Sequence, residues 1–165
     1  MFDIFIIGGG INGSGIARDA AGRGYKVGLA DQHDFGAQTS SWSTKLIHGG
    51  IRYLENYEFS LVRESLKERE IIYQIAGTIS KPLDFILPHV SNLRPSWMIR
   101  IGLFLYDFLA GKSVFPKSKR LKFIKEKLHF LSKEYQYGYQ YADLQIDDSR
   151  LTLLNILDSE QYGAE

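Results

Sequence analysis

Residues 4–13 read Ile4-Phe5-Ile6-Ile7-Gly8-Gly9-Gly10-Ile11-Asn12-Gly13, an apolar run that leads directly into a glycine-rich turn. A helical pattern rich in small residues follows, and a second apolar run, Lys26–Ala30, ends at Asp31. This order of strand, glycine turn, helix, strand and acidic residue is typical of the βαβ unit that opens a dinucleotide-binding domain. A plain glycine turn in an α/β domain is the alternative, and the pattern alone does not separate NAD from FAD.

The glycines and the acid each have a predicted task at a bound dinucleotide. Gly8 allows the tight turn, Gly10 lets the backbone approach a pyrophosphate, and Gly13 lets the helix pack closely on the strands. The first helical turn, which includes Asn12, offers unpaired N–H groups and the positive end of the helix dipole to that pyrophosphate. The carboxylate of Asp31 can accept hydrogen bonds from a ribose diol. We therefore predict that these five residues bind the cofactor.

Composition restricts the class of protein. The 165 residues suffice for one ordinary domain, and a hydrophobic content of 44% indicates a globular chain. A net charge of +1 argues against a dedicated nucleic-acid binder, and the absence of cysteine excludes disulfides, thiolate metal sites and cysteine nucleophiles. No secretory signal is recognisable, and the longest apolar stretch, Trp97–Ala110, is too short to span a bilayer. We expect a soluble, cytoplasmic protein.

A second polar region lies between the βαβ unit and the rest of the chain. Residues Gln32–Ser43 form a hydroxyl-rich loop, and Thr44–Tyr53 combine a lysine, a histidine, two glycines and an arginine within ten residues. Such a loop can bind phosphates or ribityl hydroxyls, and Gly49-Gly50 would let the main chain lie against a flat ring. The alternative is a mobile surface loop without a ligand.

The remaining pattern predicts helices over 57–75, 96–110 and 149–161 and strands over 83–88 and 138–146. We expect the apolar stripe of helix 96–110 to pack in the core, with a surface that faces lipid or a partner as the alternative. Leu151, Leu154 and Leu157 are expected on the buried side of the last helix, which Asp147 or Asp148 caps. The lysine-rich stretch Lys112–Lys127 is expected to be a solvated connector, although such a cluster can also attract anionic lipid.

Several blocks of the sequence closely resemble the FAD-dependent glycerol-3-phosphate dehydrogenases. The blocks extend over essentially the whole chain and are Ile6–Ala17, Thr39-Ser40-Ser41, Lys45–Glu55, Leu87-Pro88-His89, Asn92–Pro95, Ile99–Leu103 and Asp147–Leu151. Members of this family are much longer, so the chain resembles only their N-terminal part. Asp31 departs from the glutamate that is common in the family, and Trp42 and Thr44 replace small residues of the loop.

The resemblance implies that sn-glycerol 3-phosphate is oxidised to dihydroxyacetone phosphate. A hydride would leave C2 for the flavin N5, and the reduced FAD would pass its electrons to a membrane quinone. It places Gly8, Gly10, Gly13 and Asp31 at the FAD pyrophosphate and ribose. The residues that it places along the rest of the cofactor are Thr39, Ser40, Lys45, Leu46 and His48. Arg52 and Tyr53 match positions that face the substrate, and a guanidinium suits a phosphate because it binds two oxygens at once.

The expected fold class is α/β: a Rossmann-like FAD-binding βαβ unit followed by the start of an α+β substrate domain, truncated. Residues 1–80 would belong to the FAD-binding domain, 81–146 to the substrate or cap domain, and 147–165 to a helix that returns toward the FAD domain. The resemblance also implies a peripheral contact with the inner face of the cytoplasmic membrane, to which Lys112–Lys127 could contribute, and no nucleic acid. It places the general base beyond Glu165.

Three alternatives remain from the sequence. A glycerol-3-phosphate oxidase would return the electrons to oxygen instead of a quinone, and the motifs do not distinguish the two. The chain alone could be a non-catalytic flavin-binding fragment, because too few strands remain to complete a dinucleotide fold. An NAD-linked Rossmann enzyme is disfavoured, since such enzymes have no reason to repeat the pattern of residues 39–53.

Overall fold

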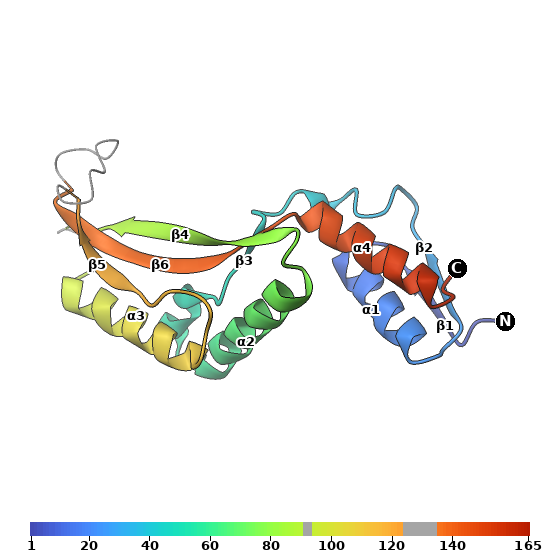
Figure 1. Ribbon diagram of the computed structural model, residues 1–165, viewed down its shortest axis with the longest axis horizontal. Helices are drawn as coiled ribbons and strands as arrows, with labels where there is room; N and C mark the ends of the chain where they lie inside the picture. Colours follow the sequence, from blue (N-terminus) through green and yellow to red (C-terminus); the bar gives the residue numbers. More distant parts are fainter. Residues whose placement is uncertain (91–93, 124–134) are drawn as a thin grey trace. The chain divides into compact units, whose positions relative to one another are not determined.

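The computed structural model describes residues 1–90, 94–123 and 135–165, and the chain forms two compact units. The first unit is discontinuous and comprises Met1–Leu46 and Ile146–Glu165. The second unit comprises Ile47–Gln145. Figure 1 shows the elements of both units in sequence colours.

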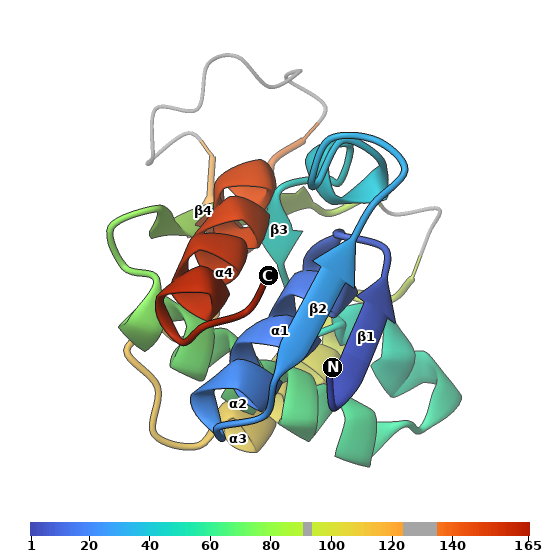
Figure 2. The ribbon, with the colours of Figure 1, turned by 90° about the vertical axis from the view of Figure 1, so that its right-hand side faces the viewer.

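The first unit contains the predicted βαβ arrangement. Strands β1 (Ile4–Ile7) and β2 (Val27–Ala30) pair in parallel, with Ile4 opposite Val27 and Ile7 opposite Ala30, and helix α1 (Ile11–Gly22) connects them. Figure 2 shows the two strands side by side with α1 packed behind them. The core here consists of small side chains, namely Ala17, Ala20, Ala21 and Val27. Small residues allow the close helix–strand contact that the glycine pattern predicts.

The C-terminal segment of the described chain completes the first unit. Helix α4 (Asp148–Gln161) packs against α1 and is capped by Asp147, whose carboxylate accepts a hydrogen bond from the N–H of Arg150. This confirms Asp147 as the N-cap. After the helix, the N–H of Glu165 donates to the carbonyl of Val27, and the N–H of Leu29 donates to the carbonyl of Glu165. The backbone of Glu165 therefore lies along the edge of β2.

The second unit is built on a sheet with α2 and α3 on the same side of it (Figure 1). The sheet has the order β3-β6-β4, and β5 also pairs with β6 in antiparallel fashion. The elements are β3 (Leu46–Ile47), η2 (Ile51–Asn56), α2 (Phe59–Ile75), β4 (Ser80–Pro88), α3 (Ser96–Ala110), β5 (Lys119–Lys122) and β6 (Tyr137–Ile146). Their centre is a buried cluster of Val62, Leu66 and Tyr106.

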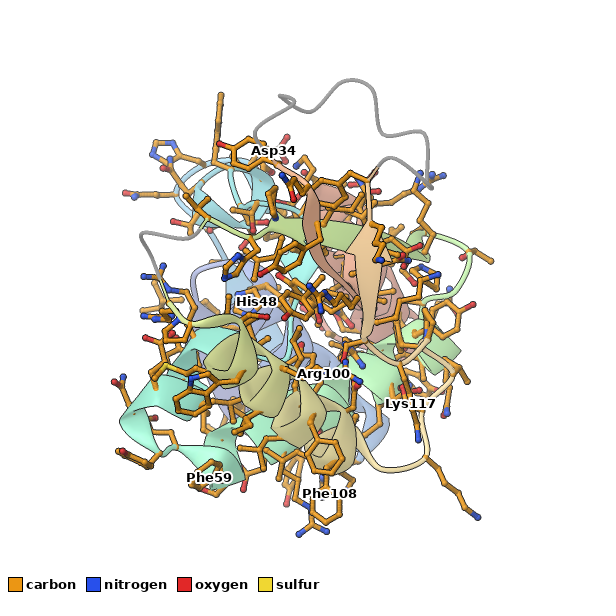
Figure 3. All side chains as sticks on the ribbon, turned by 90° about the vertical axis from the view of Figure 1, so that its left-hand side faces the viewer. Asp34, His48, Phe59, Arg100, Phe108 and Lys117 are labelled. Carbon is orange, nitrogen blue, oxygen red and sulfur yellow. The ribbon has the colours of Figure 1, made fainter. Side chains whose placement is uncertain are left out.

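The expectation that the apolar stripe of α3 packs in the core is wrong for most of its residues. Leu103 and Tyr106 are the buried residues of this helix. Trp97 and Phe104 are each 62% exposed and Phe108 is 70% exposed, and Ile101 is exposed too. In Figure 3, Phe108 points away from the sheet. The sheet contacts only one face of the helix. Apolar side chains extend around more of the helix than that face, so the remaining ones are exposed.

Two further expectations require correction. On α4 the buried residues include Thr152 and Ser159, whereas Leu154 and Leu157 are exposed and Leu151 is half-buried, because the contact with the small residues of α1 is close. Within the lysine-rich stretch Lys112–Lys127, residues Lys119–Lys122 form strand β5 and are not a solvated connector. A β-strand alternates its side chains, so the buried Leu121 lies between exposed cations. Residues 124–127 of that stretch lie outside the described residues.

The compact units and the expected domains have different limits. The contacts divide the chain after Leu46 and after Gln145, while the expected domain boundaries follow residues 80 and 146. The difference arises because α2 packs against α3 and η2, within the second unit. The assignment of domains in the longer family members stays a prediction.

Candidate functional site

The glycine turn after β1 has the backbone geometry that the motif predicts. Gly8 has φ +108°, a conformation that side chains other than glycine rarely adopt. A Cβ atom on Gly13 would lie only 1.8 Å from the carbonyl oxygen of Gly8. The turn and the first turn of α1 therefore touch through backbone atoms, and Gly13 leaves no room for a side chain.

The N-terminus of α1 is open to a ligand. Gly10 is its N-cap and provides no side-chain cap, and the first turn contains no acidic residue. Within the described residues, the N–H groups of Asn12 and Gly13 have no hydrogen-bond acceptor. Two free donors at the positive end of a helix dipole suit an anionic group such as a pyrophosphate.

The hydroxyl-rich loop reaches this helix terminus. Ser40, in the short helix η1 (Thr39–Ser41), accepts a hydrogen bond from the N–H of Ile11 at 2.9 Å through its Oγ. A Cβ atom on Gly10 would lie 3.1 Å from the same Oγ. The structure thus brings Ser40 to the predicted pyrophosphate position, and its neighbour Thr39 is exposed at the start of η1.

Asp31 connects the end of β2 to the glycine turn. Its Oδ1 accepts from the N–H of His33 at 2.8 Å, and its Oδ2 accepts from the N–H of Gly9 at 2.7 Å. The hydrogen bond from His33 has the larger effect and that from Gly9 the next, and both hold the pKa of Asp31 below its usual value. The carboxylate is therefore ionised near neutral pH and retains lone pairs for the hydroxyl groups of a ribose. The residues at this turn fit a dinucleotide.

Lys45, which the sequence places along the cofactor, makes a structural ion pair. Its Nζ lies 2.6 Å from Oδ1 of Asp148 at the start of α4, and Oδ2 of Asp148 accepts from the hydroxyl of Ser43 at 2.6 Å. Burial alone would raise the pKa of Asp148, but the hydrogen bonds from Lys45, Ser43 and Ser149 outweigh it and hold that pKa well below its usual range. The sequence did not identify Asp148 as the residue that fixes this loop.

The other predicted residues lie in or next to the second unit. Leu46 is half-buried in β3, and His48 is exposed just after that strand. Arg52 and Tyr53 belong to η2, and both are exposed. Arg52 lines a cavity of about 590 Å³ between η2 and α3 and, within the described residues, makes no ion pair. Its guanidinium is available for an anion.

A buried polar cluster that the sequence pattern did not reveal lies behind this segment and is formed by Arg69, Tyr106 and Asp143. Arg69 is only 2% exposed, and its Nη1 lies 2.8 Å from Oδ1 of Asp143. Its position offered a signal, because Arg69 follows Val62 and Leu66 at helical spacing and so falls on the buried face of α2. No local signal marks Asp143 as its partner, 74 residues further along the chain.

Comparison with known proteins gives the family. The family described as FAD dependent oxidoreductase matches residues 3–165. A glycerol-3-phosphate dehydrogenase from Pseudomonas aeruginosa is 52% identical over 164 residues, which are 99% of this chain and 32% of that protein. A D-erythritol 1-phosphate dehydrogenase from Brucella abortus is 49% identical over 163 residues, which are 98% of this chain and 32% of that protein.

A solved structure extends the similarity to the fold. The glycerol-3-phosphate dehydrogenase from Bacillus halodurans, complexed with FAD, is 31% identical with a TM-score of 0.69, and the match covers 99% of this chain and 25% of that one. The chain therefore spans about a third or less of the length of these relatives. Because the family matches nearly every residue, including the glycine turn and Asp31, the chain belongs to the FAD-dependent oxidoreductases.

Proposed function

We propose that the protein oxidises sn-glycerol 3-phosphate to dihydroxyacetone phosphate with FAD as its cofactor. The observation that carries this proposal is 52% identity to a glycerol-3-phosphate dehydrogenase across 99% of the chain. The open N-terminus of α1 behind the Gly8–Gly13 turn supports the cofactor, because its donors match the charge of a pyrophosphate.

Residues of the first unit would hold the cofactor. The N–H groups of Asn12 and Gly13 would bind the pyrophosphate, and Ser40 lies at the same helix terminus. The ionised Asp31 would accept hydrogen bonds from the ribose hydroxyls. When bound, FAD supplies the acceptor for the hydride that leaves C2 of the substrate. Thr39, Lys45, Leu46 and His48 are proposed along the rest of the cofactor, and the Lys45 ammonium already neutralises Asp148.

Residues of the second unit would hold the substrate. The exposed guanidinium of Arg52 can bind two phosphate oxygens and stays charged at any working pH. Tyr53 follows it in η2 and is exposed too. Together they would orient the substrate by its phosphate, which is catalysis by positioning.

Dye reduction by the intact gene product tests the reaction. We expect glycerol 3-phosphate to reduce the bound flavin and an artificial acceptor, and glycerol without phosphate to do neither. D-erythritol 1-phosphate is the necessary comparison, because a relative that is 49% identical is named for that substrate. Failure of glycerol 3-phosphate to reduce the flavin would refute the proposed reaction, and a higher kcat/KM for the erythritol phosphate would reassign the substrate.

We propose a quinone as the electron acceptor, with oxygen as the alternative. The product that forms when the reduced flavin is reoxidised distinguishes the two acceptors. We expect a soluble quinone analogue to reoxidise the flavin and only traces of hydrogen peroxide to form in air. Stoichiometric hydrogen peroxide without an added acceptor would show an oxidase.

We further propose a peripheral contact with the cytoplasmic membrane through α3. In the described parts of the chain, every helix is too short or too polar to cross a bilayer. The exposed side of α3 carries Trp97, Phe104 and Phe108, which suit insertion at a membrane surface. Trp97 shares a surface hollow with the cations Arg100, Lys119 and Arg120, whose charge complements anionic headgroups. Figure 3 views this side of α3 and labels Arg100 and Phe108.

Sedimentation with liposomes tests the membrane contact. We expect the intact gene product to bind vesicles that contain anionic lipid, and the double variant Phe104→Ser, Phe108→Ser to bind at least about fivefold more weakly. Leu154→Ser with Leu157→Ser is the matched control, because these side chains are also exposed on a helix, 44% and 52%, but lie on α4. Equal loss of binding in both double variants would contradict the assignment to α3.

A further inference from the structure

A buried polar cluster in the second unit lies behind the segment that carries the proposed substrate residues. Three elements meet at Oδ1 of Asp143 in β6: Nη1 of Arg69 in α2 lies 2.8 Å away, and the hydroxyl of Tyr106 in α3 donates to it at 2.6 Å. Arg69, Tyr106 and Asp143 are each no more than 3% exposed. Buried charges are retained only where they are paired and hydrogen-bonded, so the Arg69–Asp143 pair and the Tyr106 hydroxyl hold these three elements together.

The same cluster holds the backbone of Gly49. The N–H of Gly49 donates to the hydroxyl oxygen of Tyr106 at 2.9 Å and points to Oδ1 of Asp143 at 3.4 Å. Burial, followed by the nearby charge of Asp143, raises the pKa of Tyr106 far above its usual value. The phenol therefore keeps its proton, donates it to Asp143 and accepts from Gly49 at the same time.

Steric contacts leave the segment little freedom to move. A Cβ atom on Gly49 would lie 2.3 Å from Cδ2 of Leu66 and 2.5 Å from the hydroxyl of Tyr106. The next residue, Gly50, has φ +69° and turns the chain directly into η2, where Arg52 and Tyr53 lie. The direction in which η2 leaves the core is thus set at Gly50, two residues before Arg52.

We propose that Tyr106 and Asp143 are positioning residues for Arg52, and that they act through the Gly49 N–H. This inference rests on the proposed function, in which Arg52 binds the substrate phosphate. Arg52 itself makes no ion pair within the described residues that would orient it, so its place depends on the backbone that carries it. Catalysis by positioning is sensitive to such a backbone, because a misplacement of about 1 Å costs up to about 100-fold in rate.

Tyr106→Phe in the intact gene product tests the proposal. The substitution removes the nearer acceptor of the Gly49 N–H, leaves only Oδ1 of Asp143 at 3.4 Å, and preserves the ring that packs in the core. We expect the KM for glycerol 3-phosphate to rise about tenfold, FAD content to stay unchanged, and kcat to fall by less than about threefold. Hydrogen exchange at the Gly49 amide should be faster than in the wild type.

Tyr139→Phe is the matched control. Tyr139 is also buried, at 1% exposure in the same unit. Its hydroxyl bonds Oγ of Ser96 at 2.6 Å and donates to the carbonyl of Ser96 at 3.1 Å, so the control loses two hydrogen bonds, as Tyr106→Phe does. We expect its KM and its Gly49 exchange to remain at the wild-type values. Equal changes in KM for the two variants would overturn the proposal, since a general loss of stability would then explain both.

A double-variant comparison shows whether Tyr106 acts through Arg52. Arg52→Lys should raise the KM on its own, and adding Tyr106→Phe to it should raise the KM by less than about twofold, because coupled residues are not additive. Full additivity would overturn the inference. Should Tyr106→Phe fail to fold, hydrogen exchange in the wild type tests the inference: we expect the Gly49 amide to exchange slowly, as the amides of β6 do. Exchange at Gly49 as fast as that of an exposed loop amide would overturn the inference.

The proposed function and the positioning role fail in different ways. A wild-type protein that oxidises neither glycerol 3-phosphate nor D-erythritol 1-phosphate would overturn both. An active wild-type protein whose KM is indifferent to Tyr106→Phe would overturn the positioning role alone.

Discussion

At the scale of single residues, the glycine turn depends on the space that each glycine leaves. Gly13 and Gly15 lie two positions apart on α1, yet their surroundings differ. A Cβ atom on Gly13 would meet the carbonyl of Gly8 at 1.8 Å, whereas one on Gly15 would meet nothing within 4 Å. The motif therefore contains one glycine that backbone contact requires and a neighbouring one that it does not.

We expect Gly13→Ala to weaken FAD retention by more than about tenfold, because the turn must open to admit the methyl group. Gly15→Ala is the matched control and should preserve FAD, with helix stability increased by about 0.5–1 kcal/mol. Flavin absorbance after desalting of the intact gene product, together with thermal unfolding, provides both measurements. Similar FAD content in the two variants would contradict the assignment of the turn.

At the scale of elements, the first turn of α4 holds the hydroxyl-rich loop. Asp147 caps the helix, while Asp148 accepts from Ser43 and Lys45. Sequence pattern alone predicts a cap at one of two adjacent aspartates, but it does not reveal that the other is bound to residues more than 100 positions earlier. Such a long-range hydrogen bond leaves no periodicity in the sequence.

Asp148→Asn should lower the free energy of unfolding by about 1–2 kcal/mol near pH 7. This loss is at the low end of the range for hydrogen bonds to charged groups, because Lys45 is half exposed to solvent. The pKa of Asp148 is lower in the folded chain. Its stabilisation is therefore complete above the unfolded pKa of about 3.9 and is lost as the pH falls further. Denaturation between pH 7 and pH 3 should show the difference from wild type shrinking below pH 4. Asp147→Asn, which preserves a good cap, should change stability by only a few tenths of a kcal/mol.

Local patterns predicted most of the elements, and contacts between distant residues explain the failures. The limits of α3 agree with the sequence because Pro95 precedes it and Gly111 follows it. Its exposed Phe104 and Phe108 were assigned to the core because an apolar stripe does not reveal what covers it. The glycine turn was predictable as a local motif, whereas the Arg69–Asp143 pair depends on a strand and a helix meeting in space.

At the scale of the whole molecule, the described chain shows much uncovered apolar surface. On β1, Phe5 is 57% exposed and Ile7 is 89% exposed, and the sheet of the first unit has two strands. The relatives are about three times as long, since the chain covers 32% of their length. Apolar strands of this kind normally lie inside a larger sheet.

We expect residues 1–165 expressed alone to be poorly soluble, to retain FAD weakly and to show no turnover. The exposed strand β1 favours aggregation through its apolar side chains. Flavin absorbance and dye reduction, compared with those of the intact gene product in parallel, measure the difference. Detectable turnover by the short chain would contradict this expectation and would show that residues 1–165 contain a sufficient site.

The discontinuous first unit has a consequence for the order of folding. Its first segment ends at Leu46, but α4, which packs against α1, follows only after the whole of Ile47–Gln145. On the ribosome, the 125 residues that separate Gly22, the end of α1, from Asp148 must therefore be made before its partner helix begins. Closing so long a loop has a high entropic cost when the intervening chain is unstructured. If the second unit folds first, it brings its own two ends together and so reduces that cost. Folding of the second unit should thus precede and accelerate completion of the first unit.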